Sequence, residues 1–193
     1  RGVRFSAQLG FRIDPPTFEA MREQAQRLEA IARERVRDEM EKTLLSDHPA
    51  EGLSLMRELG LLRGVIPELA EAVGKPQGSD STFDLFEHTL MVVRFAPASV
   101  ELRLAALFHD LAKGWTRVET PDGRLAFPDH DTLSAELAER RLEVLRFPRR
   151  TIDAVTHLVR HHMFSYTSAQ SDASIRRMLS RLGEAAVGDL IRL

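Results

Sequence analysis

The chain has 193 residues, of which 43% are hydrophobic and 29% are charged. This balance is that of an ordinary globular protein, and it excludes a disordered tail or a collagen-like polymer. Because cysteine is absent, a disulfide framework, a thiolate zinc site and a cysteine nucleophile are excluded as well. The formal net charge is only −2, so any nucleic acid must be bound by a local basic face.

No apolar run approaches the roughly 20 residues that cross a bilayer, and the N-terminus lacks an apolar signal segment. We therefore expect a soluble, cytoplasmic protein with no membrane partner. The chain opens on Arg1 rather than Met, and it reaches Leu193 without a helix stop signal. Both features are expected of a fragment of a longer protein.

Helical spacing of apolar residues runs through the first part of the chain. Asp14 is a candidate N-cap, with Pro15 at the first helical position that follows it. Further helices are expected over residues 29–42, where acids and bases alternate as on a solvated face, and over 49–62. A run of turn-forming residues at 74–80 is the clearest linker.

The second part has the same helical period. We expect helices over residues 83–95, 100–113, 131–145, 151–163 and 174–182, the last capped by Asp172, and a loop over 115–128. Strand-like alternation never lasts more than a few residues. The sequence therefore predicts an all-α fold divided near residue 75.

Six of the seven histidines follow the linker: His88, His109, His130, His157, His161 and His162. Imidazole and carboxylate ligands without cysteine favour Mn, Fe, Ni, Zn or Mg. His109 and Asp110 are adjacent near the end of an apolar helix, so they place two potential ligands on one buried wall. Lys113 falls near the same face, where its ammonium can hold a phosphate oxygen.

Asp84 lies four residues before His88 and is expected to share its helix face. Several other residues have interpretations that involve no ligand. His157 is assigned to a hydrogen-bonded core position, and Asp131 to a possible N-cap. For His161 and His162 the alternative role is a favourable interaction with the helix dipole.

The order of these histidines on predicted helices, with the His109-Asp110 pair and Lys113 between them, resembles the HD-domain metal-dependent phosphohydrolases. The resemblance implies a helical bundle that binds a divalent ion (Mg, Mn or Ni) through histidines, the His-Asp pair and a late Asp. The implied metal ligands are His88, His109, Asp110, His161 and His162. The implied catalytic residues are Asp110, Lys113 and His130.

The first half resembles the neck and body of bacterial tRNA nucleotidyltransferases and poly(A) polymerases. The matching segments are 1–14, 34–42, 60–62 and 66–69. In that family an Arg-x-x-Arg-Phe motif helps to recognise the nucleotide, and Arg1, Arg4 and Phe5 correspond to its end. The resemblance thus implies a helical neck and body over 1–74, with Arg1, Arg4 and Arg35 binding nucleotide or RNA, and an HD domain over 80–193.

Two parts of the family pattern are missing. The catalytic head, a small sheet with a Gly-rich loop and paired Asp residues, would precede Arg1. The last Asp of the HD motif is expected beyond Leu193, because Asp189, the nearest substitute, comes a turn or more too early. We therefore expect an HD domain that is incomplete at its C-terminal end.

Two hypotheses follow. The first is a metal-dependent phosphohydrolase. The resemblance implies that it acts on 2′-phosphates or 2′,3′-cyclic phosphates, at a tRNA 3′ end or on small nucleotides, in a CCA- or A-adding tRNA nucleotidyltransferase. The alternative is a non-catalytic tRNA-binding body with the HD fold as scaffold. In that alternative the phosphate contacts come from Arg4, Arg12, Arg33, Arg35 and Arg37.

Overall fold

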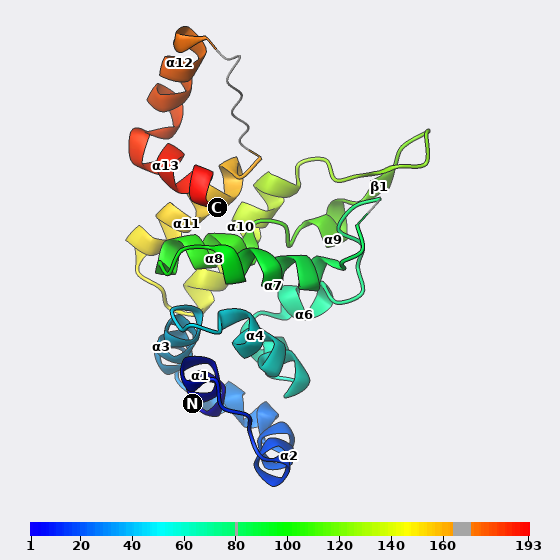
Figure 1. The fold of residues 1–193 in the computed structure, drawn as a ribbon, viewed down its shortest axis with the longest axis vertical. Helices are drawn as coiled ribbons and strands as arrows, with labels where there is room; N and C mark the ends of the chain where they lie inside the picture. The colour runs from blue at the N-terminus through cyan, green and yellow to red at the C-terminus, as the bar shows by residue number, and fades with distance from the viewer. Residues whose placement is uncertain (80, 164–170) are drawn as a thin grey trace.

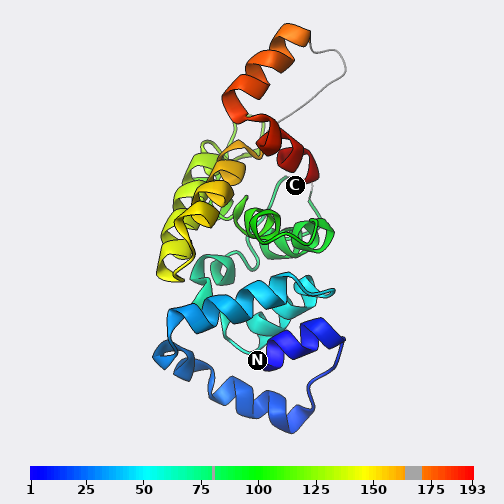
Figure 2. The ribbon, with the colours of Figure 1, turned by 90° about the vertical axis from the view of Figure 1, so that its left-hand side faces the viewer.

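The computed structural model describes residues 1–79, 81–163 and 171–193. These residues are predominantly helical, which confirms the expected all-α class. The molecule is elongated, with α1 and α2 at one end and α12 and α13 at the other (Figures 1 and 2). None of the described helices has the length and apolar character needed to cross a bilayer. Asp80, the last residue of the expected linker and the first of the expected HD domain, lies outside the described residues.

The first region contains α1 (Gly2–Leu9), α2 (Pro15–Glu23), the 3₁₀ helix η1 (Ala25–Ala30), α3 (Arg33–Leu44), α4 (Pro49–Glu58), α5 (Leu62–Val65) and α6 (Pro67–Glu71). Asp14 caps α2 as expected, since its side chain accepts a hydrogen bond from the Thr17 amide. The helix expected over 29–42 begins only at Arg33, because Ile31 is extended and separates α3 from η1. The helix expected over 49–62 ends at Glu58, shortly before Gly60 at φ 73°.

The second region contains α7 (Leu85–Phe95), α8 (Val100–Phe108), α9 (Lys113–Thr116), α10 (His130–Val144), α11 (Arg149–His161), α12 (Asp172–Leu182) and α13 (Glu184–Arg192). The segment expected to be a loop instead holds part of α9 and a hairpin of β1 (Val118–Glu119) and antiparallel β2 (Leu125–Ala126), with Val118 opposite Ala126. Strands of two residues are too short for alternation to reveal them.

Two expected caps are wrong. Ser171, not Asp172, caps α12 by accepting from the Ser174 amide at 3.3 Å. Asp129, not Asp131, occupies the N-cap position of α10, with a left-handed φ of 53°. Asp131 instead accepts a hydrogen bond from the Thr132 amide at 2.8 Å.

One cluster of buried apolar side chains runs through both regions, from Val3 in α1 to Leu190 in α13. A buried arginine adds a polar connection. Arg103 of α8 donates hydrogen bonds to the carbonyls of Ala96 at 3.2 Å, Ser46 at 2.8 Å and Leu44. Burial lowers the pKa of Arg103. The bonds to Leu44 and Ser46 satisfy carbonyls at the C-terminal end of α3, and the bond to Ala96 satisfies one at the C-terminal end of α7; a helix cannot satisfy such carbonyls by itself.

A partly buried ion pair and an exposed hydrogen bond also cross between the regions. Arg141 of α10 forms a bidentate pair with Glu68 of α6, with its shortest N···O distance at 2.7 Å. Arg37 of α3 donates to the carbonyl of Arg146 at 2.6 Å. Packing therefore continues across the sequence division near residue 75.

The segment before α7 is fixed by Asp84. The Asp84 carboxylate accepts from the amides of Glu87 and Gly74, both at 2.7 Å, and the Glu87 side chain completes a capping box. The expectation that Asp84 shares the face of His88 is therefore wrong, because Asp84 caps the helix. The carbonyl of Lys75 accepts from Leu85 at 2.8 Å, and Ser79 accepts from Leu125 of the hairpin at 2.7 Å.

Candidate metal centre

Asp110 lies at the centre of a histidine cluster. The helix α8 is largely buried, and His109 and Asp110 follow directly after its last residue, so the chain carries both into the interior. Asp110 is 3% exposed and His109 7%. A carboxylate at such depth requires charged or hydrogen-bonding neighbours.

One carboxylate oxygen of Asp110 faces two histidines from α7 and the end of α8. The Nε2 atoms of His88 and His109 lie 3.3 and 3.1 Å from Oδ2. They lie 3.2 Å from each other. These three side chains form the first group of potential metal ligands.

The other oxygen faces a second pair. His130 is the first residue of α10, and His162 directly follows α11. Their Nε2 atoms each lie 3.3 Å from Asp110 Oδ1 and 3.2 Å from each other. Asp110, His130 and His162 form the second group, so the carboxylate of Asp110 is shared between the two groups.

Backbone carbonyls set the orientation of three of these rings. The Nδ1 atoms of His109, His130 and His162 lie 2.7–2.8 Å from the carbonyls of Ala106, Phe127 and Val159, each three residues earlier. A carbonyl only accepts, so each Nδ1 carries a proton. In the neutral ring the Nε2 lone pair then points at the carboxylate of Asp110. Lone pairs of nitrogen and oxygen that face each other repel, so a cation or a proton is required between them.

The spacing of these atoms fits a metal ion. Two ligands bound at about 2.0–2.2 Å to one ion lie roughly 2.8–3.6 Å apart at octahedral to tetrahedral angles. The separations in both groups, 3.1–3.3 Å, fall in this range. Asp110 Oδ1 is moreover a buried oxygen without a hydrogen-bond partner. The donor set of imidazole nitrogens and one carboxylate suits a divalent transition ion.

The electrostatics of the cluster keep Asp110 ionised. Burial opposes its ionisation, but the charge of His109 and the close contacts of the surrounding imidazoles outweigh burial, so the pKa of Asp110 lies well below its usual range. The contact with Asp110 raises the pKa of His130. A proton on His130 and a metal ion compete for the same place, as is general for histidine ligands.

Lys113 lies where the sequence predicts it. Its ammonium is 2.8 Å from Asp110 Oδ2 and 5.4 Å from the centre of the Phe127 ring.

Among the described residues, neither His161 nor Asp189 belongs to the two groups of potential ligands. The His161 ring instead packs 4.7 Å from that of His157, and Asp189 pairs with Arg192 at 3.6 Å.

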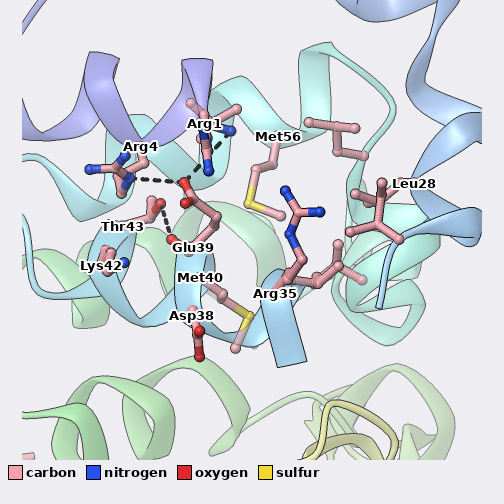
Figure 3. Close-up of a pocket in the computed structure, with 15 residues that line it drawn as sticks. Arg1, Arg4, Leu28, Arg35, Asp38, Glu39, Met40, Lys42, Thr43 and Met56 are labelled. Carbon is pink, nitrogen blue, oxygen red and sulfur yellow. Dashed lines mark hydrogen bonds and ion pairs between the residues drawn. The ribbon is translucent and has the colours of Figure 1, made fainter. Parts of the chain in front are cut away.

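The arginines expected to bind nucleotide or RNA surround a different cavity, of about 390 Å³, in the first region. Arg1, Arg4 and Arg35 all line it (Figure 3). Arg4 is held there by Glu39 at 2.8 Å and by Gln8 at 2.9 Å. Arg35 extends toward Met56 and Leu28 (Figure 3).

The remaining arginines of the alternative hypothesis have other surroundings. Arg33 donates to the carbonyl of Gly64 at 3.0 Å, and Arg37 to that of Arg146. Arg12 is exposed. Arg33 and Arg37 therefore have structural contacts that compete with phosphate binding.

Two known families match segments of the chain. Residues 10–73 match a family described as the probable RNA and SrmB-binding site of polymerase A, and residues 85–187 match the HD domain. Because the HD match covers more than half of the chain, the chain belongs to the HD-domain family. The residues before the HD domain are similar to the polymerase A family. In particular, the chain is similar to part of several tRNA nucleotidyltransferases, which confirms the family resemblance inferred from the sequence.

Three relatives illustrate the similarity. The CC-adding tRNA nucleotidyltransferase of Thermus thermophilus is 43% identical over 84% of this chain and 40% of its own length. The A-adding enzyme of Deinococcus radiodurans is 36% identical over 100% of this chain and 46% of its own. The multifunctional CCA protein of Nitrosomonas eutropha is 33% identical over 84% and 40%. The chain thus spans less than half the length of these relatives.

Proposed function

We propose that the HD region is a metal-dependent phosphohydrolase for 2′-phosphates or 2′,3′-cyclic phosphates, carried by tRNA 3′ ends or small nucleotides. The observation that carries the proposal is the shared carboxylate of Asp110 between two histidine pairs. The relatives support a place for this region in a tRNA nucleotidyltransferase, CCA- or A-adding, whose catalytic head would precede Arg1.

The residues of the cluster would act as metal ligands, and Lys113 would bind phosphate. Asp110 with His88 and His109 would hold one divalent ion, and Asp110 with His130 and His162 a second. A divalent ion in such a site lowers the pKa of a bound water and polarises a phosphoryl oxygen. Lys113, tied to Asp110, would bind a phosphate oxygen and stabilise the charge that develops on it. His130, expected from the sequence to act on the phosphate, fits the role of a ligand.

The first test replaces the shared carboxylate. In Asp110→Ala, metal-supplemented hydrolysis of 2′,3′-cyclic AMP should fall at least about 100-fold, since both groups of ligands lose a member. The circular dichroism spectrum should keep its helical form. Asp122→Ala, an exposed acid of the hairpin, serves as the matched control and should keep full activity. Equal activity in Asp110→Ala would refute the proposal.

The second candidate is a tRNA-binding body without hydrolytic activity. The observation in its favour is the cavity bearing Arg1, Arg4 and Arg35, within a region partly matched to an RNA-binding family. This candidate predicts tRNA binding that weakens steeply with salt and is reduced in Arg35→Gln. It also predicts no hydrolysis with any divalent ion.

A further inference from the structure

A cavity of about 370 Å³ lies beside the metal centre, between residues of α9 and residues of the segment that leads into α7. Its lining residues are Lys75, Pro76, Lys113, Gly114, Trp115 and Arg117. Lys113 connects it to the metal centre, because Lys113 lines the cavity and its ammonium is hydrogen-bonded to Asp110. A molecule in this cavity would therefore lie next to the proposed reaction centre.

The charge of the cavity selects an anion. Three of its lining residues are cations, and none of the described residues that line it is acidic. Lys75 has its own carboxylate neighbour, Glu71, but at 4.0 Å and outside the lining. A concave surface of one sign raises the local concentration of the opposite ion.

The cavity also offers an aromatic surface that is already positioned. The Trp115 side chain is 46% exposed, and the ammonium of Lys75 lies 4.5 Å from the centre of its ring. Gly114 permits this arrangement, since a Cβ there would lie 2.8 Å from Lys75 Cδ. The bond from Leu85 to the Lys75 carbonyl and the bond from Gly74 to Asp84 fix the backbone on either side.

We propose that this cavity binds a nucleoside phosphate, with the base against Trp115 and the phosphate held by Lys75, Lys113 and Arg117. An exposed indole stacks on any base, and base stacking on aromatic side chains is tolerant of sequence. A volume of this size is at the lower end for small-molecule pockets and suits one nucleotide. The inference rests on the proposed phosphohydrolase activity, because a nucleotide bound in this cavity would be the substrate of that activity.

The sequence provides a direct probe, because Trp115 is its single tryptophan. We would titrate the full chain with 2′-AMP while exciting tryptophan selectively, in Mg²⁺. A saturable quenching of fluorescence is expected. Adenosine, which lacks the phosphate, and ribose 5-phosphate, which lacks the base, should each bind at least about tenfold more weakly, a loss of ~1.4 kcal/mol. No quenching by 2′-AMP at millimolar concentration, or equal binding of all three compounds, would overturn the inference.

Variants separate the two contacts, with binding of 2′-AMP measured by calorimetry. Trp115→Ala should weaken binding about tenfold, whereas Trp115→Phe should restore most of it because a stacking face remains. Arg117→Gln should weaken binding and reduce its dependence on salt. Arg124→Gln is the matched control, since Arg124 is a neighbouring exposed cation of the hairpin that does not line the cavity. Unchanged binding in both Trp115→Ala and Arg117→Gln would refute the assignment.

The source of the nucleotide and the hydrolytic activity are tested separately. A short RNA ending in a 2′-phosphate should quench at least as well as 2′-AMP if the ligand is an RNA end, and less well if it is a free nucleotide. Quenching with the stated selectivity supports the cavity even where no hydrolysis occurs, in which case only the phosphohydrolase proposal fails. Hydrolysis of a cyclic nucleotide without any quenching overturns the cavity and leaves the hydrolytic site standing.

Discussion

His161 and His162 are neighbours in the sequence but have different partners. The His162 ring meets Asp110 and His130, whereas the His161 ring packs on His157. Burial and the charges of His157 and nearby arginines lower the pKa of His161. Only one residue of the pair therefore has the position of a metal ligand.

Replacing these two histidines separately tests this assignment. His162→Ala should weaken binding of a divalent ion at least about tenfold, because the second group loses a nitrogen ligand. His161→Ala, its matched control, should bind the ion as the unsubstituted chain does. Metal content after dialysis and calorimetric titration measure both. The reverse order of effects would contradict the assignment.

Residue spacing predicts part of this site. The adjacent pair His109-Asp110 and Lys113 three residues later are visible in the sequence, because one helix turn brings them together. The choice between His161 and His162 depends on where α11 ends, and the sharing of Asp110 depends on how four elements pack. Neither can be read from spacing alone. Lys75 and Trp115 are far apart in the chain and carry no motif, so only the fold brings them together.

Glu41 provides a test of pH dependence. Burial raises the pKa of its carboxyl above the usual value of 4.5. Ionisation therefore costs folding energy, and this cost is absent at low pH and appears as the pH rises above about 4.5. Glu41→Gln should accordingly increase the free energy of unfolding at pH 7 and leave it unchanged near pH 4. Urea unfolding at the two pH values measures the difference, and a gain of the same size at both would contradict this cause.

At the scale of elements, α4 approaches α1 and α3 closely at one glycine. A Cβ added to Gly52 would lie 2.5 Å from Thr43 Cγ2 and 3.1 Å from Ala7 Cβ. Gly188 in α13 has no atom within 4 Å of the same position. The two glycines therefore differ in packing although both are helical.

Alanine at each position should have opposite effects. Gly52→Ala should lower the free energy of unfolding by about 1–2 kcal/mol, because overpacking outweighs the gain in helix propensity. Gly188→Ala should raise it by about 0.5–1 kcal/mol through propensity alone. Denaturant melts of both variants provide the comparison. A stabilised Gly52→Ala would mean that the contact of α4 with α1 and α3 is looser than described.

The sequence predicts the long helices but misses the shorter elements. The long helices follow from apolar spacing, and Asp14 is correctly predicted as a cap. Asp84 is misassigned because its position relative to His88 fits a helix face as well as a cap, and only the bonds to Gly74 and Glu87 decide. The hairpin after α9 escapes prediction because its strands have two residues each.

At the scale of the whole molecule, the continuous core and Arg103 predict a single unfolding transition. Circular dichroism reports on all helices, and Trp115 fluorescence reports on the second region alone. The two signals should give the same midpoint. A dichroism transition in two steps, with fluorescence following one of them, would show that the regions unfold separately.

Removal of metal by a chelator should lower this midpoint for both signals together, since a ligand that binds only the folded state stabilises the whole cooperative unit.

Each oriented histidine of the metal centre is fixed by its own stretch of chain. His109, His130 and His162 donate from Nδ1 to a carbonyl three residues earlier, not to a side chain of a neighbouring ligand. Loss of one ring therefore leaves the proton positions of the others unchanged. Single substitutions at these three positions should therefore lower the affinity for a divalent ion in steps, while the remaining rings keep their orientation.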